Sequence, residues 1–359
     1  MLARESGHTM KTVTEKLDNC GNCCREANMV RANEIEQALN CLPRKILFDY
    51  DTPTERLVRI EKELGVCPIY MKRDDLNGVG PGGNKVRPLE YLLGEAAANG
   101  CDVVLASGQE NSNLCTIAAA ACCRIGIRCI LVHNDPPPKE HIGNVLLNRL
   151  MGIEELYIGA IPEPERDIFV AELAEKLKKE GQYPFIVENG ATMPHSAVGY
   201  INILLELLRN YEKHPVSDVF VPGGNGGIAA GVVFGAALLE KPFRVHVISV
   251  EHTKQELERI IHSMLPEMES YLGCKATIGI DDVMTIYDEY RGEGWGIPAK
   301  ESDGMIGYVA AQEGIFLERV YTSKTFWGMY DLLKSGRVKS KGACMIHSGG
   351  FAALDYQYR

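Results

Sequence analysis

A lysine at the end of a glycine-rich turn is the first group in the sequence that could do chemistry. Lys85 follows a Gly-Gly-Asn turn between the apolar segment 68–72 and the helix-like segment 86–98. Glycine lets a backbone adopt positive φ angles and approach a ligand closely. A lysine held in such a turn can be desolvated, lose its proton and form an imine with a carbonyl group. An ordinary turn with a solvated lysine is the competing interpretation, and the turn alone does not decide between the two.

Ser112 and Asn113 form a second candidate site between a predicted strand, residues 103–106, and an Ala-rich helix, residues 117–125. Serine and asparagine at a helix start present side-chain donors and backbone N–H groups to an anion. This turn is therefore a candidate for holding a substrate carboxylate. A plain helix cap would use the same two residues.

A third loop holds four glycines in five positions, with no lysine or arginine, between a predicted strand and a predicted helix. Main-chain N–H groups at a helix N-terminus bind phosphate well, so the loop is a candidate phosphate site. A fourth loop follows the predicted strand 343–347, where the hydroxyl of Ser348 is a candidate partner for a ring nitrogen. The residues of the third loop are Gly223, Gly224, Asn225, Gly226, Gly227 and Ile228.

The segments around these loops alternate between strands and helices. Parallel neighbouring strands need helical crossovers, so the alternation predicts an α/β protein with a parallel sheet. Functional loops in such proteins gather at the carboxyl ends of the strands. The predicted strands are 68–72, 103–106, 129–133, 184–188, 218–221, 245–250 and 343–347, and the predicted helices are 86–98, 117–125, 144–151, 197–211 and 228–240.

Composition and charge exclude several classes of protein. The 359 residues are 45% apolar and 24% charged, so the chain can bury a large core and form two domains. Its net charge is −10, and clustered basic residues that would hold nucleic acid are missing from the sequence. Apolar runs of the roughly 20 residues that a membrane helix needs are missing too. We expect a cytoplasmic protein without a nucleic-acid or membrane partner.

Residues 1–41 are predicted to be an N-terminal extension outside the catalytic core. This segment contains Cys20, Cys23 and Cys24, the one group of cysteines that might bind a metal ion. A second cysteine pair at zinc-site spacing does not follow, so we interpret the three as unpaired thiols and expect no metal site.

The order of the four loops resembles the fold-type-II pyridoxal 5′-phosphate (PLP) enzymes, which are related to the tryptophan synthase β subunit. Within them it is similar to the D-cysteine desulfhydrase and 1-aminocyclopropane-1-carboxylate (ACC) deaminase family. The resemblance covers about residues 42–358, and its most specific parts are KRDDLNG, GGNKVRPLEYL, EGIFLERVYTSKT and IHSGGFAAL. It implies two three-layer αβα domains with mostly parallel twisted sheets and the cofactor in the cleft between them. Residues 42–87 and 201–359 would form the large domain and residues 88–200 the small one, in a homodimer.

Roles for individual residues follow from the resemblance. Lys85 would carry PLP as a Schiff base and then act as the base at the α-carbon. Ser112 and Tyr321 would complete the catalytic group, with Tyr321 as the proton carrier near the leaving group. The residues expected to contact the cofactor are Lys85, Asn84, Asn113, Gly223, Gly224, Asn225, Gly226, Gly227, Ile228 and Ser348.

The expected substrate pocket departs from the family pattern. Its residues would be Ser112, Asn113, Leu114, Trp295 and Tyr321. Leu114 stands where His or Gln is common, and Trp295 stands where the family usually has a second tyrosine. Pro88 replaces a basic residue, and Thr322 replaces the glutamate of ACC deaminases, which argues against opening of a cyclopropane ring.

The resemblance favours α,β-elimination from a small amino acid, such as D-cysteine, cysteate or a chloroalanine, to pyruvate and ammonia. ACC deaminase-like or other PLP chemistry is the first alternative. An NAD-dependent oxidoreductase is the second, because Gly224, Gly226 and Ala229 match a dinucleotide loop and Glu251 ends the following strand. A catalytically silent PLP-fold binding protein is the third, motivated by the changes at Leu114, Pro88 and Trp295.

Overall fold

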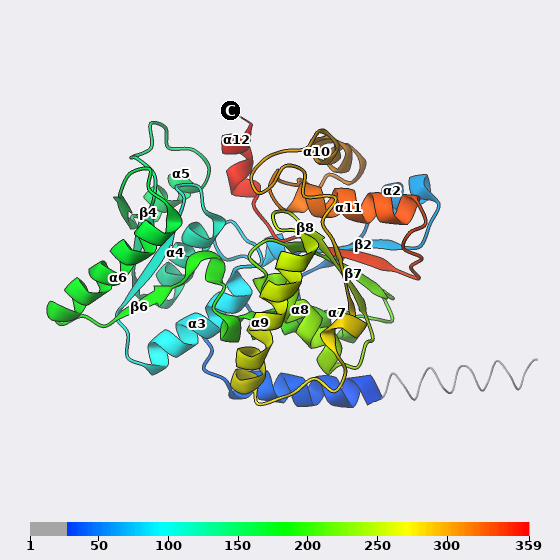
Figure 1. Ribbon diagram of the computed structural model, residues 1–359, viewed down its shortest axis with the longest axis horizontal. Coiled ribbons are helices and arrows are strands. Elements are labelled where there is room, and N and C mark those ends of the chain that lie inside the picture. The colour runs from blue at the N-terminus through cyan, green and yellow to red at the C-terminus, as the bar shows by residue number, and fades with distance from the viewer. Residues whose placement is uncertain (1–26, 359) are drawn as a thin grey trace, which may run out of the picture.

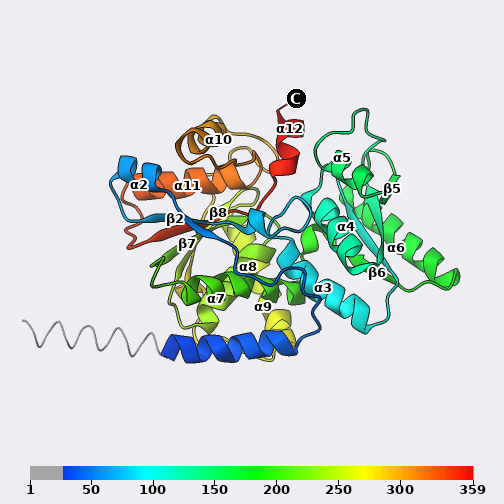
Figure 2. The ribbon, with the colours of Figure 1, turned by 180° about the vertical axis from the view of Figure 1, so that it is seen from behind.

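The computed structural model describes residues 27–358, and these residues are built around two β-sheets (Figures 1 and 2). The smaller sheet has the strand order β5-β4-β3-β6, and all of its strands are parallel. The larger sheet has the order β1-β2-β10-β7-β8-β9, and among its described strands only β1 is antiparallel to its neighbour. The smaller sheet contains β3 (Val103–Gly108), β4 (Arg128–His133), β5 (Glu154–Tyr157) and β6 (Pro184–Val187). The larger contains β1 (Thr54–Arg56), β2 (Ile69–Lys72), β7 (Asp218–Gly223), β8 (Arg244–Ser249), β9 (Met284–Tyr287) and β10 (Ala343–Ile346).

Helices cover both faces of the smaller sheet. Successive side chains of a strand point to opposite faces, so Val104 packs toward α3 and α4, whereas Val103 packs toward α6. The resulting unit has three layers. Its helices are α3 (Val86–Ala98), α4 (Asn113–Ile125), α5 (Gly143–Leu150) and α6 (Glu163–Lys179).

The larger sheet is layered in the same way. Val219 belongs to the apolar cluster shared with α7, α8 and α9, and Phe220 to the cluster shared with α2, α10 and α11. Residues 27–41 are also helical and pack on the first cluster through Ala32, Ile35 and Leu39. The helices are α2 (Val58–Leu64), α7 (Ile201–Arg209), α8 (Gly227–Leu238), α9 (Lys254–Leu272), α10 (Lys300–Glu313) and α11 (Thr322–Lys334).

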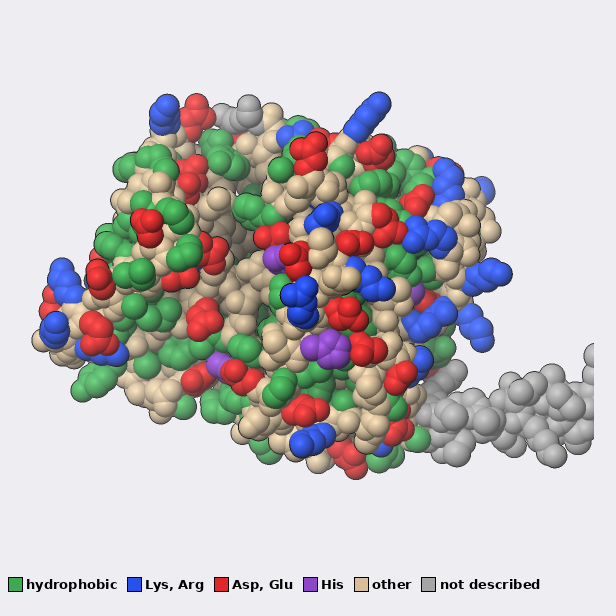
Figure 3. Space-filling model, viewed as in Figure 1, with side chains coloured by type: hydrophobic (Ala, Val, Ile, Leu, Met, Phe, Trp, Pro, Cys, Tyr) green, Lys and Arg blue, Asp and Glu red, His purple; other side chains and the backbone are tan. Residues whose placement is uncertain are grey.

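Three of the predicted loops leave neighbouring strands of the larger sheet. Strand β10 pairs in parallel with both β2 and β7, so their carboxyl ends lie side by side. The Lys85 turn follows β2, the glycine loop follows β7 and Ser348 follows β10. The molecular surface is hollowed between the lobe that holds α6 and the lobe that holds α9 (Figure 3). The strand order therefore places these loops together.

The predicted α/β class with mostly parallel sheets is confirmed, and so is every predicted strand. The helix predicted over 197–211 is corrected in its first part, because Pro194–Tyr200 is a 3₁₀ segment that leads into α7. Gly199 packs there against α3, and a Cβ at Gly199 would lie 2.5 Å from the carbonyl oxygen of Arg87. The elements that the sequence patterns missed are β1, β5, β9, α2, α6, α9, α10, α11 and the short α12 (Leu354–Gln357).

Part of the predicted N-terminal extension lies outside the described residues, and Cys20, Cys23 and Cys24 are in that part. Within residues 27–358, a helix of sufficient length and apolarity to cross a membrane was not found. The division into residues 42–87 plus 201–359 and residues 88–200 stays a prediction.

Candidate active site

Lys85 lies directly before α3, and its amine points to the turn that follows β6. Its Nζ donates a hydrogen bond to the carbonyl oxygen of Gly190 at 2.6 Å. Burial lowers the pKa of Lys85 from 10.5 to about 8, because a desolvated ammonium is less stable than the neutral amine. A larger share of this lysine is therefore an uncharged nucleophile near neutral pH than is usual for lysine.

This shift predicts how the cofactor-free protein responds to pH. Only the neutral amine attacks an aldehyde, so the rate at which added PLP gains its protein-bound visible absorbance should rise with pH and level off above about 8. Stopped-flow absorbance between pH 6 and pH 11 measures this profile. A midpoint near 10.5, the value of a solvated lysine, would contradict the desolvated site.

The turn that carries Lys85 is held rigidly by its own backbone and by Asn77. The Asn77 amide donates to the carbonyl oxygens of Asp74 at 2.7 Å and Gly83 at 2.8 Å. Gly82 has a φ of 74°, and a Cβ there would lie 1.8 Å from the carbonyl oxygen of Asp75, so only glycine fits. The backbone N–H of Asn84, the residue before the lysine, donates to the Ser348 carbonyl at 3.0 Å. The lysine turn and the Ser348 loop are therefore in direct contact.

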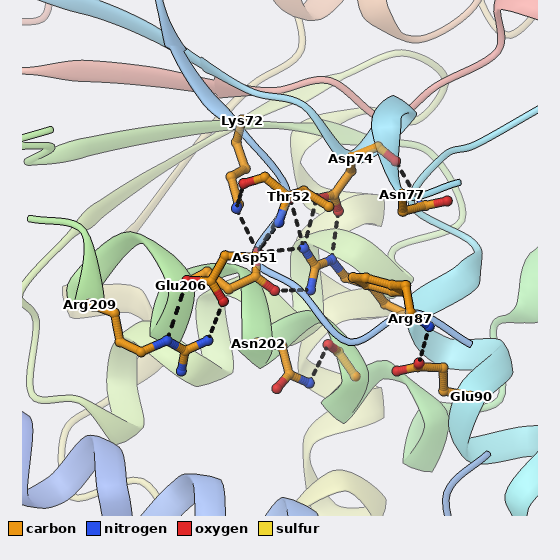
Figure 4. A network of polar contacts seen from close by, with 12 residues as sticks. Asp51, Thr52, Lys72, Asp74, Asn77, Arg87, Glu90, Asn202, Glu206 and Arg209 are labelled. Atoms are coloured by element: carbon orange, nitrogen blue, oxygen red, sulfur yellow. Dashed lines mark hydrogen bonds and ion pairs between the residues drawn. The ribbon is translucent and has the colours of Figure 1, made fainter. Parts of the chain in front are cut away.

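A buried ionic network lies beneath this turn (Figure 4). Two residues after the lysine, the Arg87 guanidinium forms hydrogen bonds of 2.7 Å to each carboxylate oxygen of Asp74 and one of 2.7 Å to Glu206. Lys72 binds the same Glu206 carboxylate at 2.5 Å. Burial acts to raise the pKa of Glu206, but Arg87 and Lys72 outweigh it and lower this pKa from 4.5 to about 2. The two cations and two anions compensate one another and tie β2, α3 and α7 together.

The glycine loop 223–228 approaches Lys85 through Gly190. A Cβ on Gly190 would lie 2.9 Å from the Asn225 side-chain nitrogen, and the Gly190 carbonyl accepts the Lys85 hydrogen bond. Gly226 has a φ of 88° and stands at the N-terminus of α8, where a side-chain cap is missing among the described residues. Backbone N–H groups at a helix start and the positive end of the helix dipole favour a phosphate, so this loop suits one.

Tyr321 lies against the same loop. A Cβ on Gly224 would be 3.2 Å from Cε1 of the Tyr321 ring. The Trp295 indole nitrogen donates to the Tyr321 hydroxyl oxygen at 2.8 Å. Burial raises the pKa of Tyr321 above its usual range, and the hydrogen bond from Trp295 acts in the opposite direction. Tyr321 is therefore a neutral phenol at physiological pH.

The Ser112 and Asn113 turn faces this group from the smaller sheet. Ser112 caps α4, and its Oγ accepts from the backbone N–H of Cys115 at 3.4 Å. The Asn113 side-chain nitrogen would lie 3.2 Å from a Cβ on Gly350, so this turn meets the loop that contains Ser348. Leu114 is 3% exposed and packs in the apolar cluster of α3 and α4, which leaves little of its surface for a substrate. Its contact with substrate stays a prediction.

Several residues that shape the site were not found by the patterns. Gly190 and Tyr200 contact Lys85 and Asn84 from more than a hundred residues away, the latter through a 3.2 Å hydrogen bond from the Asn84 amide to the Tyr200 hydroxyl. No local signal marks them. Arg87 lies within the GGNKVRPLEYL segment but received no role from the sequence, and its partner Glu206 is 119 positions away.

Comparison with known proteins assigns this arrangement to a family. A family profile described as "Pyridoxal-phosphate dependent enzyme" matches residues 46–349. The chain is 35% identical over 311 residues to a protein of Pyrococcus horikoshii named "Putative 1-aminocyclopropane-1-carboxylate deaminase", covering 86% of this chain and 92% of the relative. It is 31% identical over 328 residues to the "D-cysteine desulfhydrase" of Yersinia enterocolitica, covering 89% of this chain and 97% of that relative. A crystal structure described as an ACC deaminase homologue superimposes with a TM-score of 0.81 at 33% identity, covering 90% of this chain and 96% of the other.

Proposed function

Because the chain belongs to the pyridoxal-phosphate dependent enzyme family, we propose that it eliminates the β-substituent of a small amino acid such as D-cysteine. With D-cysteine and water the products are pyruvate, ammonia and hydrogen sulfide. The observation that carries this proposal is the desolvated Lys85 amine, which is bonded to Gly190 where that residue meets the glycine loop at the start of α8. A relative named D-cysteine desulfhydrase supports the choice of substrate.

PLP is the cofactor of this enzyme family, and the site fits it. When bound, PLP withdraws electron density from the α-carbon of an amino acid and so weakens the bond to its proton. Lys85 would hold the cofactor, and the backbone N–H groups of residues 224–228 would bind its phosphate. The Ser348 hydroxyl would face the ring nitrogen, and as a weaker hydrogen-bond partner than a carboxylate it favours prompt loss of the leaving group. Asn84 and Asn113 would complete the cofactor contacts.

Lys85 and Tyr321 would divide the proton transfers between them. The neutral Nζ of Lys85 takes the proton from the α-carbon, which its lowered pKa permits near neutral pH. Tyr321 gives its phenolic proton to the departing sulfur. Ser112, Asn113 and the N-terminus of α4 would bind the substrate carboxylate and orient the α-carbon toward the lysine.

ACC deaminase chemistry is the second candidate, because relatives in three Pyrococcus species carry that name as a putative assignment. The Thr322 side chain weighs against it. This residue is buried, and its Oγ1 is engaged by the backbone N–H of Glu318 at 2.7 Å. The PLP family also accounts for the glycine loop as a phosphate site, so Gly224, Gly226, Ala229 and Glu251 do not require a dinucleotide.

A substrate screen tests the proposal. Purified enzyme with PLP is offered D-cysteine, L-cysteine, cysteate, β-chloroalanine, D-serine and ACC, and pyruvate and 2-oxobutyrate are measured separately. We expect pyruvate from D-cysteine or β-chloroalanine, with ACC giving less than a tenth of that rate. Dominant 2-oxobutyrate from ACC would reassign the enzyme to ring opening. A protein that binds PLP but converts none of the six would be a silent binding module.

We also propose a homodimer that works in the cytoplasm, and the two-domain division at residues 87/88 and 200/201. Family relationship supports the dimer, and the negative net charge is compatible with a freely diffusing enzyme. Sedimentation equilibrium gives the mass of the assembly. A mass near 40 kDa would show a monomer, since the chain itself is 39.6 kDa.

A further inference from the structure

Lys324 is a buried lysine that the proposed reaction does not use. Its side chain is 0% exposed, and its Nζ donates to the carbonyl oxygens of Arg291 and Gly294 at 2.7 Å each. A third contact, to the carbonyl oxygen of Val250, is 3.4 Å long. Burying an ammonium is costly unless its hydrogen-bonding groups are satisfied, so this cage of carbonyls must be held in place whenever Lys324 is charged.

The Gly294 carbonyl belongs to an exposed loop, and the Arg291 carbonyl directly precedes that loop. Residues 292–298 are mostly exposed, and Gly292, Gly294 and Gly296 have φ angles of 64°, 138° and 72°. Glycines lose more conformational freedom than other residues when they are ordered. The ammonium of Lys324 therefore bonds to the base of a loop whose glycines make its ordering costly in conformational entropy.

The same loop carries Trp295, whose indole nitrogen meets the Tyr321 hydroxyl at 2.8 Å. Tyr321 and Lys324 are three residues apart at the start of α11, so one helix end presents both the phenol and the anchor of its partner. The helix start is itself fixed, because the buried Glu318 carboxylate accepts from the backbone N–H of Tyr321 at 2.6 Å. Phenol, indole and ammonium thus form one connected unit.

An indole nitrogen can only donate a hydrogen bond, whereas a phenol can donate and accept. Trp295 therefore occupies a lone pair of the Tyr321 oxygen and leaves the phenolic hydrogen free to point elsewhere. When that hydrogen is transferred, the resulting phenolate keeps a donor at 2.8 Å, and hydrogen bonds to a charged oxygen are stronger than those to a neutral one. The contact favours the form of Tyr321 that has just given up its proton.

We propose that Lys324 and Trp295 are positioning residues. They orient the Tyr321 hydroxyl so that its hydrogen points to the leaving group and can be donated to it. The inference rests on the proposed elimination. In the step concerned, the bond from the β-carbon to sulfur breaks with its electron pair going to sulfur, and sulfur takes the Tyr321 proton. Tyr321 then regains a proton from water, and the α-proton remains with Lys85.

The test compares two leaving groups in Trp295→Phe and Lys324→Met variants of the PLP-loaded enzyme. Sulfur gains a proton on departure, whereas chloride leaves as an anion and needs none. The ratio of kcat/KM for D-cysteine to that for β-chloroalanine should therefore fall about tenfold in each variant, the size expected for one lost hydrogen bond. Lys334→Met is the matched control, since Lys334 is an exposed residue of α11 whose Nζ lies over the Tyr330 ring, and its ratio should not change.

An unchanged ratio in Trp295→Phe would overturn the proposal, whether or not both rates fall together. That variant keeps an aromatic ring at an exposed position, so it decides the question even when Lys324→Met does not fold. A wild-type enzyme that eliminates neither substrate would instead overturn the proposed function, and this inference with it.

Discussion

A Lys85→Ala variant should lose at least about 10³-fold of its elimination rate with every substrate of the wild-type enzyme. In the proposed mechanism the change removes both the amine that would hold the cofactor and the base that would take the α-proton, and a positioned base alone contributes about 10² to 10⁴. The variant should also lose the visible absorbance of protein-bound PLP, because alanine cannot form the imine. Steady-state kinetics and an absorbance spectrum after gel filtration measure the two effects.

Lys62→Ala is the matched control for this variant. Lys62 is an exposed lysine in the last turn of α2, and its removal should leave the rate and the spectrum unchanged. A Lys85→Ala protein that retains the visible band would show that another amine carries PLP.

An Arg87→Met variant should be destabilised by roughly 3–5 kcal/mol, the cost of removing one partner from a buried ion pair. The guanidinium pairs with Asp74 and Glu206, both almost fully buried. Methionine would leave Asp74 without its ion pair and Glu206 with Lys72 alone. Equilibrium urea unfolding measures the change. Arg209→Met is the control, because Arg209 pairs with Asp51 at the exposed edge of the same network, and exposed pairs contribute less than about 1 kcal/mol.

The same network sets an acid sensitivity that the variant should shift. The folded-state pKa of Glu206, about 2, lies below its ordinary value of 4.5, so its ion pairs stabilise the wild-type protein fully above pH 4.5. This contribution is lost as the pH falls from 4.5 toward 2. Without Arg87 the folded-state pKa of Glu206 should rise toward 4.5, so the variant should lose less stability than the wild type as the pH falls from 4.5 toward 2. Equal stability of wild type and variant across pH 3 to 7 would contradict this role.

Local sequence patterns predicted the elements that are either fully buried or strongly periodic. The central strands β3 and β7 are short apolar runs because both of their faces are covered, and α3 was predicted with its observed bounds. The edge strand β1 has only three residues and is partly exposed, so it left no apolar signal. Helix α6 is rich in charged residues, which weakens its apolar periodicity. Helix α9 contains Pro266 in its interior, and proline normally argues against a helix, so neither helix was predicted.

The site could be predicted only as far as its glycines and functional side chains lie close together in sequence. The turn before Lys85 and the loop 223–228 were visible for that reason. The hydrogen bonds from Lys85 to Gly190 and from Trp295 to Tyr321 join residues 105 and 26 positions apart. Tertiary packing determines such contacts, and a single sequence carries no local record of them.

The attachment point of the cofactor tests the central claim most directly. Borohydride reduction of the PLP-loaded enzyme fixes the cofactor permanently to the amine that holds it, and peptide mass spectrometry then identifies the modified lysine. We predict that the label lies on Lys85, in the segment Gly82 to Arg87, at close to one cofactor per chain. A label on another lysine, such as the buried Lys72 or Lys324, would contradict the account.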